Sequence, residues 1–456
     1  MKKVLIANRG EIAVRIIRAC HDLGLQTVAV YSQADAEALH VLHADEAICI
    51  GEAPSQKSYL KIPNILSACE IAGADAIHPG YGFLAESANF ASICESCGLN
   101  FIGPSPSAIS LLGDKSKAKA TAKKAGCPVI TGSDGVVVNI EEARLEAKKL
   151  GFPIFIKAVA GGGGKGIRIA YNQEELIKQF AAARTEAEVS FGNPDVYFEK
   201  MIVNPRHIEV QVLGDKHGNY VHLGERDCTI QRRRQKLIEE SPSPVLTDKL
   251  RNKICQAAVN VVREVGYFSA GTVEFLLDQD LNFYFMEVNT RIQVEHTISE
   301  EITGIDLVKE QILVAQGKAL TFSQKDINFD GHAIQFRINA ENASLNFAPS
   351  PGRLEYYLPP GGPHVRVDSA CYSGYAIPPN YDSMIAKLIV HGKNRKEAID
   401  IGKRALREFH IGGVHSTIPF HLYMLEDKKF IENNYDLTYI DGLIDEGCEF
   451  VLPEKS

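Results

Sequence analysis

The chain has 456 residues, of which 45% are hydrophobic and 23% are charged, and its formal net charge is −8. This length predicts two or three domains, and the negative charge argues against a protein that binds nucleic acid through a positive surface. No segment is long and apolar enough for a membrane span, and the first residues do not read as a signal peptide. The ten cysteines lack a repeated spacing, so we expect free thiols in a reducing cytoplasm, including the close pair Cys94 and Cys97.

The first hundred residues alternate between strand and helix patterns. Apolar runs at 3–7, 26–32, 74–80 and 99–104 read as strands, and an amphipathic helix is predicted over 11–24. Alternation of this kind predicts a parallel, doubly wound sheet. The turn after the first strand is "NRGE", so the glycine fingerprint of dinucleotide-binding folds is absent there.

A lysine- and alanine-rich helix at 114–126 leads into a smaller α+β unit. This unit combines helices at 139–151 and 173–190 with strands at 152–160 and 166–172. Beyond it, strand patterns dominate, and they lie at 206–215, 218–231, 271–278, 282–289, 332–341, 352–358, 365–370 and 384–392. The sequence therefore predicts an N-terminal parallel sheet, a small middle unit and a large sheet domain.

The segment between the two strands of the middle unit, "KAVAGGGGKGI", is unusually rich in glycine. It fails the Walker A pattern because Val159 and Gly166 stand at two required positions, and its match to G-x-G-x-x-G precedes a strand rather than a helix. We interpret it as a flexible flap that closes over nucleotide phosphates, with Lys157 placed to reach an anion. An exposed hairpin without a ligand is the alternative.

The predicted hairpin "TVEFLLDQDLNFYFMEVN" places Glu274 opposite Glu287. Directly opposed residues have Cβ atoms about 5 Å apart, and two like charges at that distance are destabilising. A divalent cation would convert this cost into a binding site for Mg²⁺ and phosphates. A shifted register would instead leave two unrelated surface glutamates.

The residues after this hairpin alternate between polar and apolar side chains. An extended chain would place on one face the five polar groups Glu287, Asn289, Arg291, Gln293 and Glu295. A second polar cluster combines the arginines at 232–234 and Lys236 with His207, Glu209 and Gln211, which share one strand face. The sequence alone leaves open whether this second cluster is an anion pocket or a solvated basic run.

Together these motifs resemble the ATP-grasp superfamily and, within it, the biotin carboxylase family. The resemblance extends from about residue 3 to about residue 445 and is carried by "ANRGEIAVRIIRA", "HPGYGFLAES", "GPS", "GDK", "IKAVAGGGGKGIRI", "PRHIEVQV", "ERDCTIQRR", "MEVNTRIQVEH", "RINAE" and "YDSMIAKL". It implies an ATP-grasp fold of mixed α/β and α+β class with a mobile glycine-rich lid. The implied domains are an N-terminal Rossmann-like domain at 1–113, a connecting helix at 114–130, the lid at 131–203, the C-terminal domains at 204–446 and a tail at 447–456.

The resemblance also implies roles for individual residues. ATP would be held by Lys115, Lys157, Gly163, Gly164, Glu199, Lys200, Ile202, His207 and Gln231, together with Glu274 and Glu287. Two Mg²⁺ or Mn²⁺ ions would be bound by Glu274, Glu287 and Asn289. Bicarbonate would be bound by Lys236, Arg291, Gln293, Val294 and Glu295, with Glu295 as the base, and biotin would meet Tyr81 and Arg337. The catalytic set is thus Lys236, Arg291, Glu295 and Arg337.

Some features depart from the family pattern or limit what it implies. Arg234 replaces a histidine of many members, so the nucleotide contact of that histidine is not expected here. Ala160 replaces a glycine and Lys165 an arginine, for which we expect a slightly stiffer flap. None of the five methionines belongs to a Met-Lys-Met biotinylation site. We therefore expect the chain to carboxylate biotin on a separate carrier protein. The resemblance further implies a homodimeric subunit that works with a carboxyltransferase, first of all in acetyl-CoA carboxylase.

Other readings of the sequence remain open at this stage. A pyruvate, other acyl-CoA or urea carboxylase would use the same chemistry, because the acceptor binds to a different polypeptide. Another kind of ATP-grasp ligase is disfavoured by the Arg291–Glu295 face and Arg337. A nucleotide-sensing protein without catalysis is disfavoured because Lys236, Glu274 and Glu287 are all present.

Overall fold

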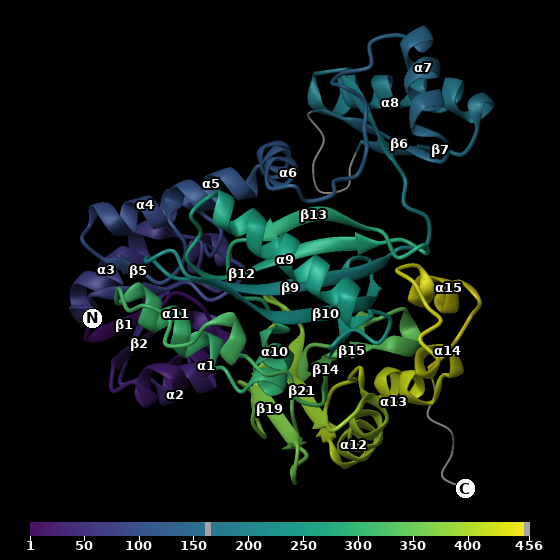
Figure 1. Ribbon diagram of the computed structural model, residues 1–456. Helices are drawn as coiled ribbons and strands as arrows, with labels where there is room; N and C mark the ends of the chain where they lie inside the picture. Colours follow the sequence, from purple (N-terminus) through teal and green to yellow (C-terminus); the bar gives the residue numbers. More distant parts are fainter. Residues whose placement is uncertain (160–165, 451–456) are drawn as a thin grey trace, which may run out of the picture. The chain divides into compact units, whose positions relative to one another are not determined.

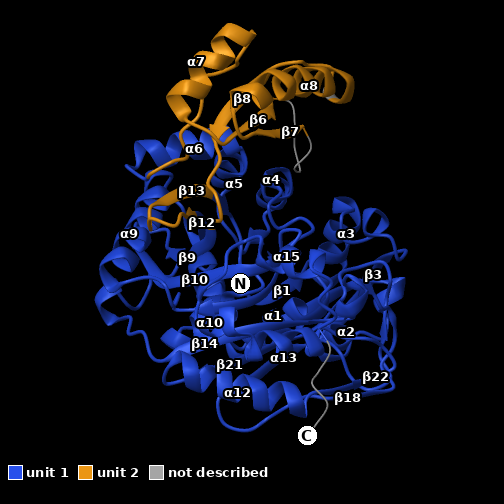
Figure 2. Cartoon of the chain, turned by 90° about the vertical axis from the view of Figure 1, so that its right-hand side faces the viewer, with its two compact units in different colours: residues 1–127, 206–275, 287–456 blue, residues 128–205, 276–286 orange. Residues whose placement is uncertain are grey.

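The computed structural model describes residues 1–159 and 166–450. The chain forms two compact units, one of residues 1–127, 206–275 and 287–456 and the other of residues 128–205 and 276–286 (Figure 2). The expected lid at 131–203 lies within the second unit. The other expected boundaries stay predictions, because 1–113 and nearly all of 204–446 belong to the first unit.

The first unit begins with a parallel sheet of order β3-β2-β1-β4-β5, which confirms the predicted doubly wound alternation (Figure 1). Its strands are β1 (Lys3–Ile6), β2 (Gln26–Ser32), β3 (Glu46–Gly51), β4 (Ala76–His78) and β5 (Asn100–Phe101). The accompanying helices are α1 (Gly10–Asp22), α2 (Leu39–His43), α3 (Ile62–Ala72), α4 (Ala88–Ser96), α5 (Pro106–Gly113) and α6 (Lys115–Lys124). Val4, Leu5 and Ile6 are all inaccessible to solvent, as expected for a parallel strand covered on both faces.

The largest sheet has eight strands in the order β13-β12-β9-β10-β11-β14-β21-β19 (Figure 1). The strands are β9 (Arg206–Gly214), β10 (Tyr220–Arg232), β11 (Gln235–Ser241), β12 (Ser269–Leu277), β13 (Phe283–Asn289), β14 (His332–Asn339), β19 (Val365–Ser369) and β21 (Met384–Gly392). The neighbours from β9 to β19 pair antiparallel. Short strands complete the unit, and they are β15 (Glu341–Asn342), β16 (Ala348–Pro349), β17 (Gly352–Arg353), β18 (Tyr356–Leu358), β20 (Ala376–Ile377) and β22 (His410–Gly412).

Helices also occupy the C-terminal region, where the sequence patterns above name only strands. They are α9 (Asp248–Glu264), α10 (His296–Thr303), α11 (Leu307–Ala315), α12 (Arg395–Glu408), α13 (Ile418–Glu426), α14 (Lys428–Ile431) and α15 (Tyr439–Asp445). The helix α10 packs across β10, β11, β14 and β21, while α9 packs on β9 and β10. Because α10 directly follows the polar segment at 290–295, its position fixes where that segment ends.

The second unit has a three-stranded antiparallel sheet of order β7-β6-β8. Its strands are β6 (Ile154–Ala158), β7 (Ile167–Ala170) and β8 (Val196–Lys200), and its helices are α7 (Ile140–Leu150) and α8 (Gln173–Phe191). Ile154, Ile156 and Phe198 form part of its own buried core with residues of both helices. The two predicted strands are confirmed as the antiparallel pair β6 and β7, whereas the glycine-rich segment predicted between them, at 160–165, lies outside the described residues.

Two further expectations concern the whole chain. Among residues 1–159 and 166–450, no helix combines the length and apolar character that crossing a bilayer requires. All ten cysteines lie in these ranges and are free thiols. Cys94 is buried in α4 and Cys97 is exposed at its end, and neither belongs to the potential metal-ligand groups found among the described residues.

Candidate active site

One lysine lies among three buried carboxylates, two from strands β9 and β12 of the eight-stranded sheet and one from the turn before α10. The Nζ of Lys236, on β11, is 2.5 Å from Glu209 Oε2, 2.6 Å from Glu295 Oε1 and 3.2 Å from Glu274 Oε1. Burial lowers the pKa of Lys236, but these three carboxylates raise it well above its usual value. An ion group buried this deeply is stable only while its charges remain paired. The cluster therefore places one ammonium group and three carboxylates within contact distance of one another.

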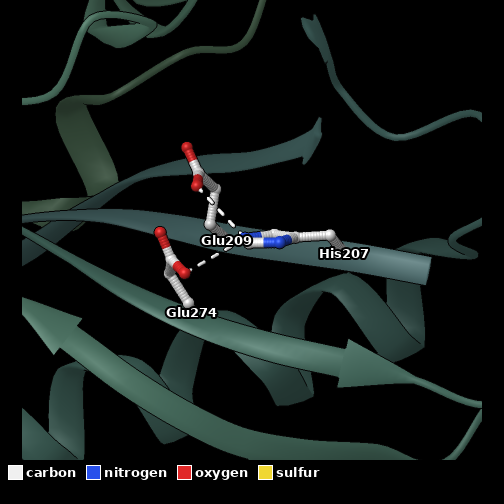
Figure 3. A group of neighbouring side chains, drawn as sticks. All are labelled: His207, Glu209 and Glu274. Atoms are coloured by element: carbon white, nitrogen blue, oxygen red, sulfur yellow. Dashed lines mark ion pairs between the residues drawn. The ribbon is translucent and has the colours of Figure 1, made fainter. Parts of the chain in front are cut away.

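His207 adds a second positive group beside the same carboxylates. Its Nε2 is 3.3 Å from Glu274 Oε2 and 3.5 Å from Glu209 Oε2 (Figure 3). Burial lowers the pKa of His207, but Glu274 opposes this effect, and the pKa rises to about 9. Burial likewise favours the neutral form of Glu274, but Lys236 and His207 lower its pKa below the usual value. At neutral pH an imidazolium therefore faces ionised carboxylates. On its other side, the Gln231 amide lies 3.5 Å from His207 Nδ1.

A fully buried arginine, Arg226 on β10, connects this cluster to its surroundings. Its guanidinium donates to Glu209 at 2.6 Å, to Gln211 at 2.6 Å and to Gln293 at 2.9 Å. Arg226 and Glu209 are directly paired across β9 and β10. Sequence reasoning gave no role to this arginine, although it lies within the motif "ERDCTIQ". The cross-strand pairing with Glu209 was the signal that could have identified it.

The predicted shared face of His207, Glu209 and Gln211 is thus confirmed, whereas the neighbouring arginine run does not join it. Arg233 and Arg234 form the exposed turn between β10 and β11, with φ of 47° and 68°. Arg232 donates to Asn346 Oδ1 at 2.6 Å instead. The basic run is therefore a hairpin turn, and only Lys236 points into the charge cluster.

The extended chain predicted from Glu287 to Glu295 is wrong beyond Asn289. Strand β13 ends at that residue, and the next six residues form bends and a turn before α10 begins at His296. The strand-like alternation was misleading because the buried partners of the segment, not sheet pairing, determine its path. Gln293 and Asn289 both donate to Glu274 Oε1, at 3.0 Å and 2.8 Å.

Glu295, the expected base, is held between two cations. It faces Lys236 on one side, and its Oε2 accepts a hydrogen bond from Arg337 at 3.0 Å on the other. Burial raises the pKa of Glu295, but Lys236 and Arg337 bring it below the usual value. Arg337 also donates to Glu239 Oε1 at 2.5 Å, and burial keeps the pKa of Glu239 raised. Glu239 is a further member of the cluster that sequence reasoning missed.

The expected metal ligands lie at the margin of this cluster. Strands β12 and β13 are neighbours in the sheet, and the turn between them is closed by hydrogen bonds between Asp278 and Asn282. Glu274 is buried, whereas the side chain of Glu287 is 36% exposed and lies 3.5 Å from Lys115 Nζ. Their direct opposition stays a prediction.

The donor chemistry at this margin fits Mg²⁺. Two carboxylates and an amide supply the hard oxygen atoms that this ion prefers. Asn289 donates its amide to Glu274 and accepts a hydrogen bond from Arg291 at 3.0 Å, so its oxygen faces away from Glu274. Arg291 also donates to Glu86 at 3.1 Å. Asn289 would need to exchange these bonds before it could serve as a ligand.

Two other groups of potential metal ligands occur among the described residues. They are His207, Glu209 and Glu274, and Glu209, Cys228 and Glu295, with ligand atoms within 4.8 Å of one another in each group. Lys236 already lies among these carboxylates. Burial and the neighbouring Glu209 raise the pKa of Cys228 well above its usual value, so it remains a thiol rather than a metal-binding thiolate. Neither group resembles a vacant metal site.

Tyr81, expected near biotin, belongs to the first unit as well. Its hydroxyl donates to Glu11 Oε1, a residue of α1. Burial and Glu11 both raise the pKa of Tyr81, while Arg337 acts in the opposite direction. Tyr81 is therefore a neutral hydrogen-bond donor within the electrostatic reach of Arg337.

The remaining expected ATP residues lie in the second unit. Lys157 on β6 forms an ion pair with Glu199 on β8, and the two strands place them two positions apart in register. Lys200 Nζ donates to the backbone oxygens of Gly151 and Phe152, each at 2.9 Å. Ile202 is half-buried just after β8. Gly163 and Gly164 lie outside the described residues, as do Ala160 and Lys165.

Family models match nearly the whole chain. The N-terminal domain of biotin carboxylase matches residues 1–109, the ATP-binding domain of the carbamoyl-phosphate synthase L chain matches 114–323, and the C-terminal domain of biotin carboxylase matches 335–442. The order of the three models agrees with the order of motifs along the sequence.

Individual relatives and solved structures agree with these matches. The chain is 58% identical to "Biotin carboxylase 1" of Bacillus subtilis over 97% of its length and 98% of that protein. It is 53% identical to a pyruvate carboxylase subunit from Methanothermobacter thermautotrophicus, covering 96% of this chain and 89% of that protein. Its fold matches the biotin carboxylase domain dimer of the Hydrogenobacter thermophilus 2-oxoglutarate carboxylase, with MgADP, ADP and bicarbonate, at a TM-score of 0.90 and 50% identity over 99% of each chain.

The fold is therefore an ATP-grasp fold, with the parallel N-terminal sheet and large antiparallel sheet described above. The matches extend along almost the entire sequence, and the matched ranges include the residues that form the charge cluster. The chain belongs to the biotin carboxylase family of ATP-dependent ligases.

Proposed function

We propose that this chain is the biotin carboxylase subunit of an acetyl-CoA carboxylase, which carboxylates carrier-bound biotin at the expense of ATP in the first step of fatty acid synthesis. The observation that carries the biotin carboxylase reaction in this proposal is the position of Lys236. It is shared by three carboxylates, of which Glu295 also binds Arg337. Cations that share one ionised base suit the binding and deprotonation of a small anion such as bicarbonate.

In this proposal, the residues that bind ATP are the ones named from the sequence, and they are Lys115, Lys157, Gly163, Gly164, Glu199, Lys200, Ile202, His207, Gln231, Glu274 and Glu287. Lys157 and Lys115 offer ammonium groups to phosphate, each of which now pairs with a glutamate. Mg²⁺ or Mn²⁺ at Glu274, Glu287 and Asn289 would neutralise phosphate charge, as metal ions do in phosphoryl transfer.

Bicarbonate is then bound by Lys236, Arg291, Gln293, the backbone of Val294 and Glu295. The carboxylate of Glu295 is ionised at neutral pH because Lys236 and Arg337 lower its pKa, so it is ready to accept the proton of bicarbonate. The resulting oxygen attacks the γ-phosphate of ATP and gives carboxyphosphate. This intermediate is labile in water, so exclusion of water by a closing lid would protect it.

Biotin accepts the carboxyl group in the last step. Carboxyphosphate breaks down to CO₂ and phosphate, the phosphate removes a proton from biotin, and the biotin nitrogen attacks CO₂. Arg337 would stabilise the negative charge that develops on the ureido oxygen, and Tyr81 would lie beside the ring. The bonds from Arg337 to Glu239 and Glu295 fix the guanidinium for this task.

The assembly follows from the same proposal. A biotin carboxyl carrier protein and carboxyltransferase subunits would act with this chain in the cytoplasm, and a homodimer is the expected form. Relatives named biotin carboxylase, from bacteria and plant chloroplasts, favour the acetyl-CoA assembly. The pyruvate and 2-oxoglutarate carboxylases among the relatives favour a second candidate, in which the chain serves a 2-oxoacid acceptor.

Reconstitution separates the two candidates. The purified chain is mixed with each biotinylated carrier and carboxyltransferase of its source organism, and incorporation of labelled bicarbonate into acetyl-CoA, pyruvate or 2-oxoglutarate is measured. We expect carboxylation of acetyl-CoA. Incorporation into a 2-oxoacid alone would reject the acetyl-CoA assignment while leaving the biotin carboxylase reaction intact.

A further inference from the structure

Lys387 is a fully buried lysine for which neither the resemblance nor the proposed reaction provides a role. It lies in β21, where it is directly paired with Arg337 of β14 on one side and with Asp368 of β19 on the other. Directly paired residues of antiparallel strands project from the same face of the sheet. Lys387 and Arg337 are thus neighbouring cations on one face of the eight-stranded sheet.

The ammonium group of Lys387 has three oxygen neighbours. Its Nζ donates to the backbone oxygen of Val294 at 3.1 Å, and it lies 3.1 Å from Glu11 Oε2 and 3.8 Å from Asp368 Oδ2. Burial of an ammonium group costs several kcal/mol unless such partners compensate it. The backbone carbonyl of Val294 thus shares the ammonium group with two carboxylates.

Val294 and Glu295 lie outside regular structure, between the end of β13 and the start of α10. Lys387 holds the carbonyl of Val294, and the neighbouring Arg337 holds the side chain of Glu295. Two adjacent cations thereby fix one dipeptide from the same sheet face. This is the dipeptide to which the proposed function assigns bicarbonate binding and proton abstraction.

The second partner of Lys387 extends its influence to the other substrate. Glu11 places Oε2 toward Lys387, and its Oε1 accepts the hydrogen bond of the Tyr81 hydroxyl. Burial raises the pKa of Glu11, while Lys387 opposes this effect. Lys387 therefore lies between the backbone assigned to bicarbonate and the tyrosine assigned to biotin.

We propose that Lys387 is a positioning residue that fixes the Val294–Glu295 backbone for bicarbonate and, through Glu11, orients Tyr81 toward biotin. This inference rests on the proposed roles of Val294, Glu295 and Tyr81. Lys387 touches no reacting atom, so its loss affects the binding of bicarbonate more than that of ATP.

The test compares Lys387→Met with Lys403→Met, which removes a lysine that pairs with Glu426 at 3.0 Å away from the site. Steady-state ATP hydrolysis is measured with free biotin while bicarbonate and ATP are varied separately. We expect the KM for bicarbonate to rise about tenfold or more in Lys387→Met, the usual effect of losing a charged hydrogen bond, with the KM for ATP within about twofold. Lys403→Met should keep both constants.

A second variant tests the link from Lys387 through Glu11 to Tyr81. Glu11→Gln keeps the Lys387–Val294 bond, so it should raise the KM for biotin and leave the KM for bicarbonate unchanged. Equal changes for ATP and bicarbonate in Lys387→Met, or a loss of thermal stability with unchanged constants, would overturn the proposal.

Folding of the variants is controlled by a double substitution. If Lys387→Met alone is unfolded, it is combined with Glu11→Gln, which removes the Glu11 carboxylate that has lost its lysine. For this double variant we expect the same changes in the KM for bicarbonate and for ATP as for Lys387→Met. If both are unfolded, Lys387 is a structural residue and the proposal is rejected. Wild-type protein without any biotin-dependent ATP hydrolysis would instead reject the proposed function itself.

Discussion

The two units of this chain hold their lysines in different ways. In the first unit, Lys236 is 11% exposed and shares three buried carboxylates, which are fixed in turn by Arg226 and Arg337. In the second unit, Lys157 is 23% exposed and pairs with Glu199 across two strands of a three-stranded sheet. Lys236 is thus part of a buried network, whereas Lys157 belongs to a more open pair.

This difference in burial matches the different roles proposed above for Lys236 and Lys157. A buried network of alternating charges keeps its geometry without a ligand, which suits the binding of a small anion and the placement of a base. A partly exposed lysine on a small sheet exchanges its partner at lower cost, which suits a group that binds phosphate only when ATP arrives. The comparison predicts that equal substitutions in the two units have unequal effects.

The largest effect is expected at Lys236. Replacing it by methionine leaves three carboxylates without their common cation, so the free energy of unfolding should fall by about 3 to 5 kcal/mol, and biotin-dependent ATP hydrolysis should fall by about 100-fold or more. Urea unfolding and steady-state kinetics measure the two quantities, with Lys403→Met as the control for loss of a lysine. A free energy of unfolding close to that of wild type would show that Lys236 does not stabilise the three carboxylates as proposed.

The pH dependence of stability tests the histidine of the same network. The pKa of His207 is raised from an ordinary 6.5 to about 9, so its ion pairs stabilise the fold fully below about pH 6.5, and this contribution disappears as pH rises through about 9. His207→Gln should therefore be less stable than wild type by on the order of 3 kcal/mol at pH 6 and nearly equal above pH 9.

This comparison is made by urea unfolding without nucleotide or metal, so that ligand binding does not contribute. A difference that stays constant from about pH 6 to about pH 9.5 would mean that His207 is neutral, and the charge arrangement around Glu274 would need revision.

A smaller effect on stability is expected in the second unit. Lys157→Gln should change the free energy of unfolding by less than about 1 kcal/mol, and it should raise the KM for ATP about tenfold because a charged phosphate contact is lost. The matched control is Lys149→Gln, which removes an exposed lysine of the same unit that pairs with Glu146. An unchanged KM for ATP would remove Lys157 from the nucleotide site.

The sequence was most informative where local patterns determine structure. Continuous apolar runs such as residues 4–6 correctly predicted buried parallel strands, since such strands need no alternation. The two strands on either side of the glycine-rich segment were also predicted correctly. The hairpin pointed to Glu274, and the family resemblance named Lys236 and Glu295 with it. The structure brings the three into one cluster, although their roles stay proposals.

The sequence failed where tertiary partners decide the conformation. The alternation at 287–295 suggested a strand, but the chain leaves the sheet after Asn289 because Glu274, Lys236 and Arg337 bind its side chains individually. Helix α9 was missed although Thr247 caps its start and its buried residues recur at helical spacing. Lys387 was missed because its partners Glu11 and Val294 are distant in sequence.

The central claim is that Glu295, held between Lys236 and Arg337, activates bicarbonate for attack on ATP. The most direct measurement is the rate of ATP hydrolysis against bicarbonate concentration, with Mg²⁺ and free biotin, for wild type and Glu295→Gln, alongside the Kd for ATP from calorimetry. The account predicts saturable, biotin-stimulated hydrolysis in wild type and a rate about 100-fold lower in the variant with an unchanged Kd. Wild-type turnover in Glu295→Gln would contradict it.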